Sequence, residues 1–343
     1  MIGISALYCD TENEGDAIRY GKHSHDLKSR PNAHAVPKSS GERRPVTAWN
    51  ITRTCNLKCI HCYSDSEEKA YAGELSTVEG KNLITDLKEF GVPALLLSGG
   101  EPLARKDVWE LAGHARNVGL RLTLTRHNYE NLHAIFDFIE RERIQRACFY
   151  HLVYAGRGSE IRKDDLSHGE SRYAMDIILE RTMDFYRRGL KKDILTVDNH
   201  VDGPYLYVKL KKINPERAEE VYRFLEWNGG GANSSGVGIG NIDFFGNVHA
   251  DQFWQDYSFG NVKERPFSEI WMDTKDPLMA GLKNRLPLLK GRCARCQWIR
   301  LCGGSFRVRA MRVYGDPWMH DPACYLTDEE IGITDKKAAV GGR

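Results

Sequence analysis

The stretch TCNLKCIHCYS, residues 54–64, places three cysteines within eight positions. Cys55, Cys59 and Cys62 are separated by three and then two residues, and no fourth cysteine lies near them. A structural zinc site needs four ligands and usually takes them from two separated pairs. Three thiolates on one short loop instead suit three irons of a [4Fe–4S] cube, whose fourth iron stays open to a small chelating molecule. A zinc ion held by these thiols and His61 is the alternative, although neighbouring side chains rarely converge on one metal.

The composition limits the class of protein. A chain of 343 residues exceeds one typical domain, so about two domains are expected. A net charge of +2 with 28% charged residues gives no drive toward nucleic acid or membrane. The start, MIGISALYCD, lacks the features of a secretory signal, and nine cysteines in such a chain argue against a disulfide framework. We therefore expect a cytoplasmic protein whose thiols are free to bind metal.

Hydrophobic patterning divides the chain into three parts. Residues 1–45 show no sustained apolar period and are expected to form a loosely ordered arm. Strands alternate with helices from residue 46 onward, which implies parallel βαβ units, and GGGANSSG at 229–236 is a linker. We expect an α/β domain over 46–232 and a small loop-rich, cysteine-containing domain over 233–343. The predicted strands are 46–52, 94–98, 120–125, 146–154 and 194–199, and the predicted helices are 76–90, 107–118, 129–142, 172–189 and 215–227.

A second motif, SGGEP at 98–102, ends the predicted strand 94–98. Together with the three-cysteine loop it resembles the radical S-adenosylmethionine (SAM) enzymes, and the pair of motifs is far more specific than either alone. The resemblance implies a partial parallel (βα) barrel and a SAM molecule chelated by the open iron. It also implies that the cluster donates an electron to SAM and that the resulting 5′-deoxyadenosyl radical abstracts a substrate hydrogen. Glycines allow close approach of the backbone, and a glutamate suits the methionine ammonium. The residues expected around SAM are His61, Tyr63, Gly99, Gly100, Glu101, Pro102 and Arg121.

Four further cysteines form a second group in the last part of the chain. Their spacing alone leaves a four-cysteine zinc ribbon open. The group also resembles the SPASM or twitch extension of radical SAM enzymes, which implies one auxiliary [4Fe–4S] cluster and two clusters in all. Phe306 and Asp251 stand where the full extension has cysteines of a further cluster. The four expected ligands are Cys293, Cys296, Cys302 and Cys324.

Longer segments narrow the resemblance to one subfamily. CFYHLVYAGRGSE, LTVDNHVDGPYLY and FGNVKERPFSEIW, among others, resemble the didecarboxysiroheme deacetylases of the alternative heme pathway, nearly end to end. This resemblance implies removal of two acetate side chains from iron didecarboxysiroheme, which yields iron coproporphyrin. A related subfamily of heme d1 biosynthesis removes propionates, and that activity is the alternative. A flavodoxin or ferredoxin is implied as the electron donor.

A tetrapyrrole needs an apolar slot, cations for its carboxylates and a ligand for its iron. Polar residues near predicted strand ends are candidates, since a parallel sheet presents its site there. Each histidine among them is more often a hydrogen-bonded structural residue, and Asp251 is expected to face solvent. The tentative substrate residues are His151, Arg157, His249 and Asp251, with Arg126 and His200 nearby and Tyr150, Tyr154, Phe253 and Trp254 as walls.

The barrel is shorter than the family pattern. Only about four of six βα units match, and about fifty residues are missing near Gly119. We expect the strands 94–98 and 120–125 to pair directly, with Arg121 beside the SGGEP motif. The gap leaves an inactive tetrapyrrole-binding or scaffold protein open. A zinc-ribbon protein that binds nucleic acid is a third alternative, although the near-neutral charge disfavours it.

Overall fold

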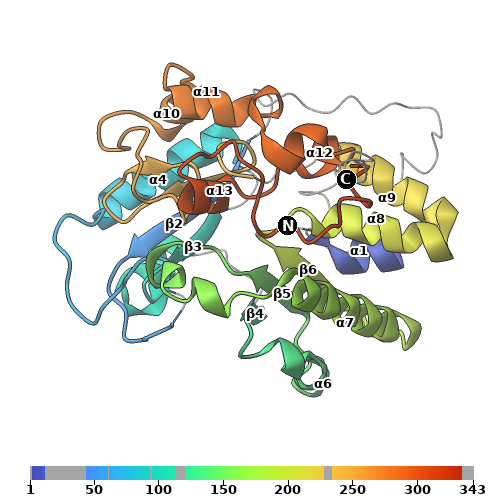
Figure 1. Ribbon diagram of the computed structural model, residues 1–343. Helices are drawn as coiled ribbons and strands as arrows, with labels where there is room; N and C mark the ends of the chain where they lie inside the picture. Colours follow the sequence, from blue (N-terminus) through green and yellow to red (C-terminus); the bar gives the residue numbers. More distant parts are fainter. Residues whose placement is uncertain are drawn as a thin grey trace.

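The computed structural model describes residues 2–11, 44–60, 62–92, 95–112, 120–227 and 234–333. Within these residues the strands form two sheets of four strands each (Figure 1). In each sheet three strands are parallel and one short edge strand is antiparallel. The predicted α/β class is confirmed.

The first sheet is built around β2 (Val46–Thr52), which is buried along its whole length. It pairs in parallel with β3 (Leu95–Gly99) on one side and with β7 (Ile239–Ile242) on the other, and β8 (Val248–His249) completes the sheet. A strand with neighbours on both sides and covered faces is rich in apolar residues, and VTAWNIT buries Val46, Ala48, Trp49 and Ile51 together with three polar side chains. The covering helices are α4 (Thr77–Phe90), α5 (Val108–Ala112), α10 (Phe267–Met272) and α11 (Pro277–Lys283).

Helix α4 begins as its sequence predicts. Ser76 is the N-cap, and its side chain and that of Glu79 form a reciprocal capping box. Leu83 and Leu87 turn inward and join Trp49 of β2 and Trp271 of α10 in one hydrophobic core. This core belongs to the first sheet alone.

The second sheet has the order β1-β6-β5-β4. Its strands are β1 (Ile2–Gly3), β4 (Leu120–Leu124), β5 (Arg146–His151) and β6 (Asp193–Val197). A separate core, which includes Phe136, Phe149 and Phe185, fills the space between this sheet and its helices. Those helices are α1 (Ile4–Cys9), α6 (Leu132–Arg141), α7 (His168–Arg187), α8 (Asp202–Ile213) and α9 (Pro215–Trp227).

The last part of the chain consists mainly of loops and short helices. A third hydrophobic cluster joins Phe306 and Val308 to Val153 beyond β5 and Ala250 beyond β8, so this part contacts both sheets (Figure 1). Its helices are α12 (Ile299–Cys302) and α13 (Arg307–Tyr314). The 3-10 turns of the chain are η1 (Pro102–Ala104), η2 (Tyr129–Asn131), η3 (Gly156–Ser159), η4 (Arg162–Asp164), η5 (Leu286–Leu288) and η6 (Gly291–Arg295).

The expected direct pairing of 94–98 with 120–125 is wrong. β3 and β4 are edge strands of different sheets. Val108 and Leu111 of α5 pack into the core of the first sheet, so the described part of this helix lies with β2 and β3. The residues of β3 are only half-buried, although LLLSG is apolar enough for a strand covered on both faces. The break therefore lies where the missing barrel units are expected, and the junction near Gly119 lies outside the described residues.

Three segments are more closely integrated than expected. The strand predicted at 194–199, assigned to a connection, is β6 and pairs in parallel with β5. β7 comes from the segment 233–343 and pairs with β2. From the predicted arm, β1 pairs with β6, while residues 12–43 lie outside the described residues. Helix α8 was not predicted.

None of the described helices is both long and apolar enough to cross a membrane. All nine cysteines are free thiols.

Candidate functional site

The three-cysteine loop leaves the C-terminal end of β2. The N–H of Leu57 donates to the thiol of Cys55 at 3.4 Å, and the thiol of Cys62 lies 3.5 Å from the hydroxyl of Ser64. Burial raises the pKa of Cys62, but hydrogen bonds from Ser64 and Ser66 outweigh burial and lower it. Hydrogen bonds of this kind stabilise the thiolate, which is the form that binds metal.

A segment beyond β5 holds the loop in place. The backbone N–H of Arg157 donates to the carbonyl oxygen of Cys62 at 2.8 Å, and its Nε donates to that of Cys59 at 3.0 Å. Gly156 has a φ of +54°, and a Cβ at this position would lie 2.5 Å from the carbonyl oxygen of Tyr63. Glycine is therefore required here. Arg157, expected at the substrate, contacts the cysteine loop.

The SGGEP motif turns against the start of the same loop. The N–H of Gly100 donates to the carbonyl oxygen of Thr52 at 2.7 Å, and that of Glu101 donates to Thr54 at 2.9 Å. Gly99 has a φ of +124°, and a Cβ at Gly99 would overlap the carbonyl oxygen of Thr52. The close approach that this glycine permits is between the backbones of β3 and β2.

Tyr63 joins the loop to both strands. Its hydroxyl donates to Oδ1 of Asn50 at 3.0 Å and lies 2.9 Å from the hydroxyl of Ser98. Its ring meets that of Phe253 edge to face, with centroids 5.3 Å apart. Burial raises the pKa of Tyr63, while Ser98 and the charge of Arg121 act to lower it. Arg121, which belongs to the second sheet, therefore lies close to the loop that follows the first.

Two other residues were expected at SAM. Pro102 begins η1 immediately after the motif. His61 lies outside the described residues.

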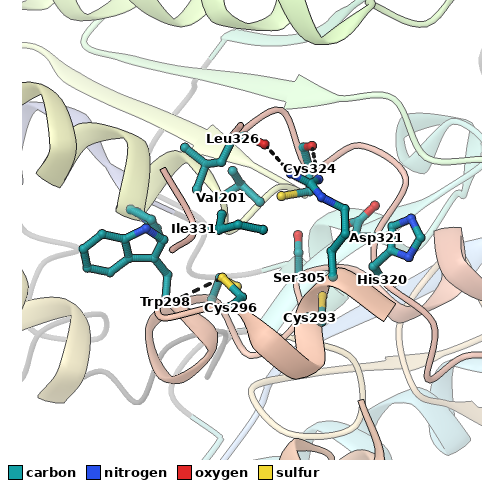
Figure 2. Close-up of a pocket in the computed structure, with 14 residues that line it drawn as sticks. Val201, Cys293, Cys296, Trp298, Ser305, His320, Asp321, Cys324, Leu326 and Ile331 are labelled. Atoms are coloured by element: carbon teal, nitrogen blue, oxygen red, sulfur yellow. Dashed lines mark hydrogen bonds between the residues drawn. The ribbon is translucent and has the colours of Figure 1, made fainter. Parts of the chain in front are cut away.

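The four cysteines of the second group line one cavity (Figure 2). The N–H of Trp298 donates to the thiol of Cys296 at 3.4 Å, two residues after the cysteine, as Leu57 does in the first loop. A backbone N–H near each of the four thiols acts to lower the pKa of that thiol. Burial raises the pKa of all four thiols, and a positively charged metal centre would hold them as thiolates. Among the described residues, no three His, Cys, Asp or Glu side chains form a group that could hold a single metal ion. The cysteines and the residues that carry these N–H groups are Cys293 with Asp321, Cys296 with Trp298, Cys302 with Gly304 and Cys324 with Leu326.

Phe306 and Asp251, which replace two cysteines of the full extension, are buried. The expectation that Asp251 faces solvent is wrong, because its side chain is enclosed and accepts hydrogen bonds from the N–H of Phe253 at 2.8 Å and from the hydroxyl of Ser235. The ring of Phe306 meets that of Phe253 at 5.6 Å, and Phe253 in turn meets Tyr63. A row of three aromatic rings thus connects the first cysteine loop to α13.

Protein groups already hold two of the histidines expected near the substrate. The ring nitrogens of His249 lie 2.8 Å from the carbonyl oxygen of Tyr257 and 3.3 Å from Asp243. Nε2 of His151 lies 3.0 Å from the carboxylate of Asp202. These contacts favour the structural interpretation of both histidines.

His200 and Asp198 differ from them. His200 is 3% exposed, and neither of its ring nitrogens has a hydrogen-bond partner in the described part of the chain, nor does Oδ1 of Asp198. Burial lowers the pKa of His200 and raises that of Asp198 to about 7. Sequence patterning did not single out Asp198.

Arg126, also expected near the substrate, is exposed and donates to Glu170 at 3.2 Å.

The chain resembles known proteins along almost its whole length. The model of the Radical SAM superfamily matches residues 49–141, which contain both sequence motifs. The chain is 48% identical to the Fe-coproporphyrin III synthase of Methanosarcina barkeri, over 97% of this chain and 99% of that protein. It is 35% identical to the pre-heme d1 synthase of Dinoroseobacter shibae, over 87% of this chain and 91% of that protein.

The first of these alignments bears on the shortened barrel. It runs over 402 positions, whereas this chain has 343 residues, so at least 59 positions (402 minus 343) are gaps in this chain. This total is large enough to include the expected loss of about fifty residues.

Two solved structures share the fold. Streptococcus suis SuiB, bound to its precursor peptide SuiA, gives a TM-score of 0.59 at 15% identity over 92% of this chain and 82% of that one. The enzyme anSMEcpe, with bound AdoMet and a Cp18Cys peptide, gives 0.55 at 14% identity over 82% and 94%. The chain belongs to the radical SAM superfamily, in the family that contains Fe-coproporphyrin III synthase and pre-heme d1 synthase.

Proposed function

We propose that this chain removes two acetate side chains from iron didecarboxysiroheme and so forms iron coproporphyrin. The observation that carries the proposal is the 48% identity to Fe-coproporphyrin III synthase over nearly the full length of both chains. Removal of propionate side chains is the second candidate, and the 35% identity to pre-heme d1 synthase favours it. The fold alone does not choose between them, because one fold supports many activities.

Membership of the superfamily implies a [4Fe–4S] cluster and SAM. We assign the cluster to Cys55, Cys59 and Cys62, whose loop already carries thiolate-stabilising hydrogen bonds. When bound together, SAM and the cluster supply a 5′-deoxyadenosyl radical that abstracts a hydrogen atom from the substrate. The chain itself holds the three-cysteine loop in position. Gly156 and Arg157, which follow β5 of the second sheet, contact this loop. The proposed surroundings of SAM are His61, Tyr63, Gly99, Gly100, Glu101, Pro102 and Arg121.

We assign one auxiliary [4Fe–4S] cluster to Cys293, Cys296, Cys302 and Cys324. Their common cavity and the hydrogen bond from the N–H of Trp298 to the thiol of Cys296 support this assignment. Sulfur atoms in metal centres commonly accept such hydrogen bonds. The proposed electron donor is a flavodoxin or a ferredoxin.

We place the tetrapyrrole beside the half-buried rings of Tyr63, Tyr150 and Phe253. Tyr63 and Arg121 both act on the pKa of Tyr150, which burial raises, so these side chains lie close together. Arg121 is exposed and would provide a cation for a substrate carboxylate. Trp254 is buried in the cluster against which Phe253 packs, whereas Tyr154 is buried with its hydroxyl donated to Asp165 at 2.6 Å.

The decisive experiment is product analysis under anaerobic conditions. Reconstituted protein is mixed with iron didecarboxysiroheme, SAM and dithionite, and the tetrapyrroles are identified by mass spectrometry. The expected product has lost both acetates, and the control with Cys55→Ala, Cys59→Ala and Cys62→Ala forms none. Substrate binding without product would instead establish the inactive tetrapyrrole-binding alternative, which the missing barrel units favour.

Metal analysis tests the auxiliary cluster separately. Two four-iron clusters require about eight irons per chain. Replacing the four cysteines of the second group by alanine should remove roughly half of the iron and leave SAM binding in place. One equivalent of zinc with iron near four would refute the auxiliary cluster and support the zinc ribbon.

A further inference from the structure

Helix α13 carries two fully buried arginines, Arg307 and Arg309. Every side-chain nitrogen of Arg309 has a partner. Nε and Nη2 donate to the two carboxylate oxygens of Asp321, at 2.9 and 2.8 Å, and Nη2 also donates to the carbonyl oxygen of Asp198 at 2.7 Å. Nη1 donates to the carbonyl oxygen of Leu152 at 3.2 Å. The buried charge of Arg309 is therefore paired and hydrogen-bonded.

The hydrogen bonds of Arg307 are incomplete. Its Nη1 donates to the carbonyl oxygens of Pro317 at 2.9 Å and Met319 at 2.6 Å. Its Nε and Nη2 have no partner in the described part of the chain, and the side chain is 0% exposed. A buried donor without an acceptor costs about 1–3 kcal/mol, and more when it is charged. Two such donors on one guanidinium indicate that a hydrogen-bond acceptor other than the described residues lies beside Arg307.

The cysteine cavity lies next to these donors. The guanidinium carbon of Arg307 is 3.2 Å from the position that a Cβ on Gly304 would take, and Gly304 lines the cavity together with Cys302. Burial lowers the pKa of Arg307, while Asp321 and the thiols of Cys293 and Cys302 act in the opposite direction. The cationic side chain therefore lies within electrostatic reach of two of the four proposed ligands.

We propose that Nε and Nη2 of Arg307 donate hydrogen bonds to sulfur atoms of the auxiliary cluster and thereby raise its reduction potential. The inference rests on the auxiliary cluster of the proposed function. A cluster held by four thiolates is negatively charged, and that charge grows by one when an electron enters. A buried guanidinium stabilises the reduced cluster more than the oxidised one, and hydrogen bonds to the sulfurs act in the same direction.

Arg292 lines the cavity, but all of its side-chain nitrogens have protein acceptors. Its Nε donates to Asp328 at 2.8 Å, and its Nη1 and Nη2 donate to the carbonyl oxygens of Cys324 at 3.3 Å and Leu326 at 2.6 Å. Figure 2 marks hydrogen bonds at Cys324 and Leu326 with dashed lines. Of Arg292 and Arg307, Arg307 is the one with side-chain nitrogens that have no acceptor among the described residues.

A redox titration followed by EPR tests the proposal. The full chain with Cys55→Ala, Cys59→Ala and Cys62→Ala leaves the auxiliary cluster as the single centre, which takes up one electron from dithionite. Arg307→Met should make reduction about tenfold less favourable, a shift of about 59 mV for one electron. Arg307→Lys keeps the charge and should show a smaller shift in the same direction. Arg309→Lys is the matched control, equally buried on the same helix, and should leave the potential unchanged.

A second measurement needs no substitution at Arg307. Protein with Arg292→Lys and selectively ¹⁵N-labelled arginine should show a ¹⁵N coupling to the reduced auxiliary cluster in pulsed EPR. An unchanged potential in Arg307→Met with full iron content, or the absence of the coupling, overturns this inference and leaves the proposed function standing. A chain that holds no second cluster overturns the inference together with the auxiliary cluster.

Discussion

The backbone N–H of Arg157 donates a 2.8 Å hydrogen bond to the carbonyl oxygen of Cys62. Arg157 follows a strand of the second sheet, and Cys62 lies on the loop that follows a strand of the first. The contact therefore joins the two sheets at the cysteine loop. It depends on Gly156, because any side chain there would meet the carbonyl oxygens of Cys62 and Tyr63.

Gly156→Ala should release the loop and impair the first cluster. A Cβ at Gly156 would lie 2.5–2.6 Å from two carbonyl oxygens, and neither backbone segment can move without disturbing the loop. We expect iron content to fall from about eight toward about four per chain, and SAM to lose its effect on the EPR spectrum of the reduced protein.

Gly189→Ala is the matched control for this substitution. Gly189 also has a positive φ, +70°, but a Cβ there would meet nothing within 4 Å. It should cost about 1–2 kcal/mol of stability through backbone strain and leave the iron content unchanged. Equal iron in both variants would contradict the positioning role of Gly156.

Hydrogen exchange should distinguish the strands beside the break from those within the sheets. In the described residues β3 pairs only with β2 and β4 only with β5, whereas β2 and β5 each have neighbours on both sides. Unpaired amides exchange more readily, so exchange followed by mass spectrometry should be faster in β3 and β4 than in β2 and β5. β6, which has two neighbours, serves as the internal control. Uniform protection would mean that other residues cover the two edges.

The local elements were predictable because their signals are local. The strand 46–52 and the helix 215–227 have the predicted bounds, and of Ser76 and Thr77, the two caps that the sequence allows for α4, the structure has Ser76. The two cysteine groups were also found from spacing, since metal-binding loops need ligands a few residues apart.

Pairing between distant segments was not predictable in the same way. Which strand pairs with β3 depends on strands elsewhere in the chain, and the sequence of β3 alone does not identify its partner. The substrate residues were the least predictable part. The histidines were proposed from their residue type alone. Arg307, which we propose at the auxiliary cluster, could be identified only from the structure, because two of its nitrogens lack acceptors there.

Restoring the missing barrel segment should strengthen SAM binding. Strands lost from the barrel would carry hydrogen bonds to the charged and polar groups of SAM, and each hydrogen bond to a charged group is worth about 1.5–3 kcal/mol. By calorimetric titration, this chain should bind SAM roughly 10- to 100-fold more weakly than a version carrying the segment of a full-length relative. Equal affinities would show that the segment makes no contact with SAM, and a complete lack of binding would favour an inactive protein.

Asp198→Asn should stabilise the protein at high pH. Burial raises the pKa of Asp198 to about 7, so the folded chain holds this proton more tightly than the unfolded chain. The contribution of Asp198 to stability is therefore greatest at low pH and falls as pH rises from about 4 through 7. Asparagine cannot ionise, and its gain in the free energy of unfolding should be larger at pH 8 than at pH 5 by about 2 kcal/mol.

Anaerobic denaturant titrations at the two pH values measure this difference. A gain from Asp198→Asn that is the same at both pH values would show that burial does not control the ionisation of Asp198.

The position of β2 between β3 and β7 also has a consequence for synthesis on the ribosome. The side chain of Asn241 on β7 donates to the carbonyl oxygen of Ala48 on β2, across a separation of 193 residues. The second sheet takes its three parallel strands from the intervening chain, and all of them leave the ribosome before β7 does. Since domains form as their residues become available, we expect the second sheet to assemble first. The strand that precedes the cysteine loop is thus among the first to be translated and among the last to gain both of its neighbours.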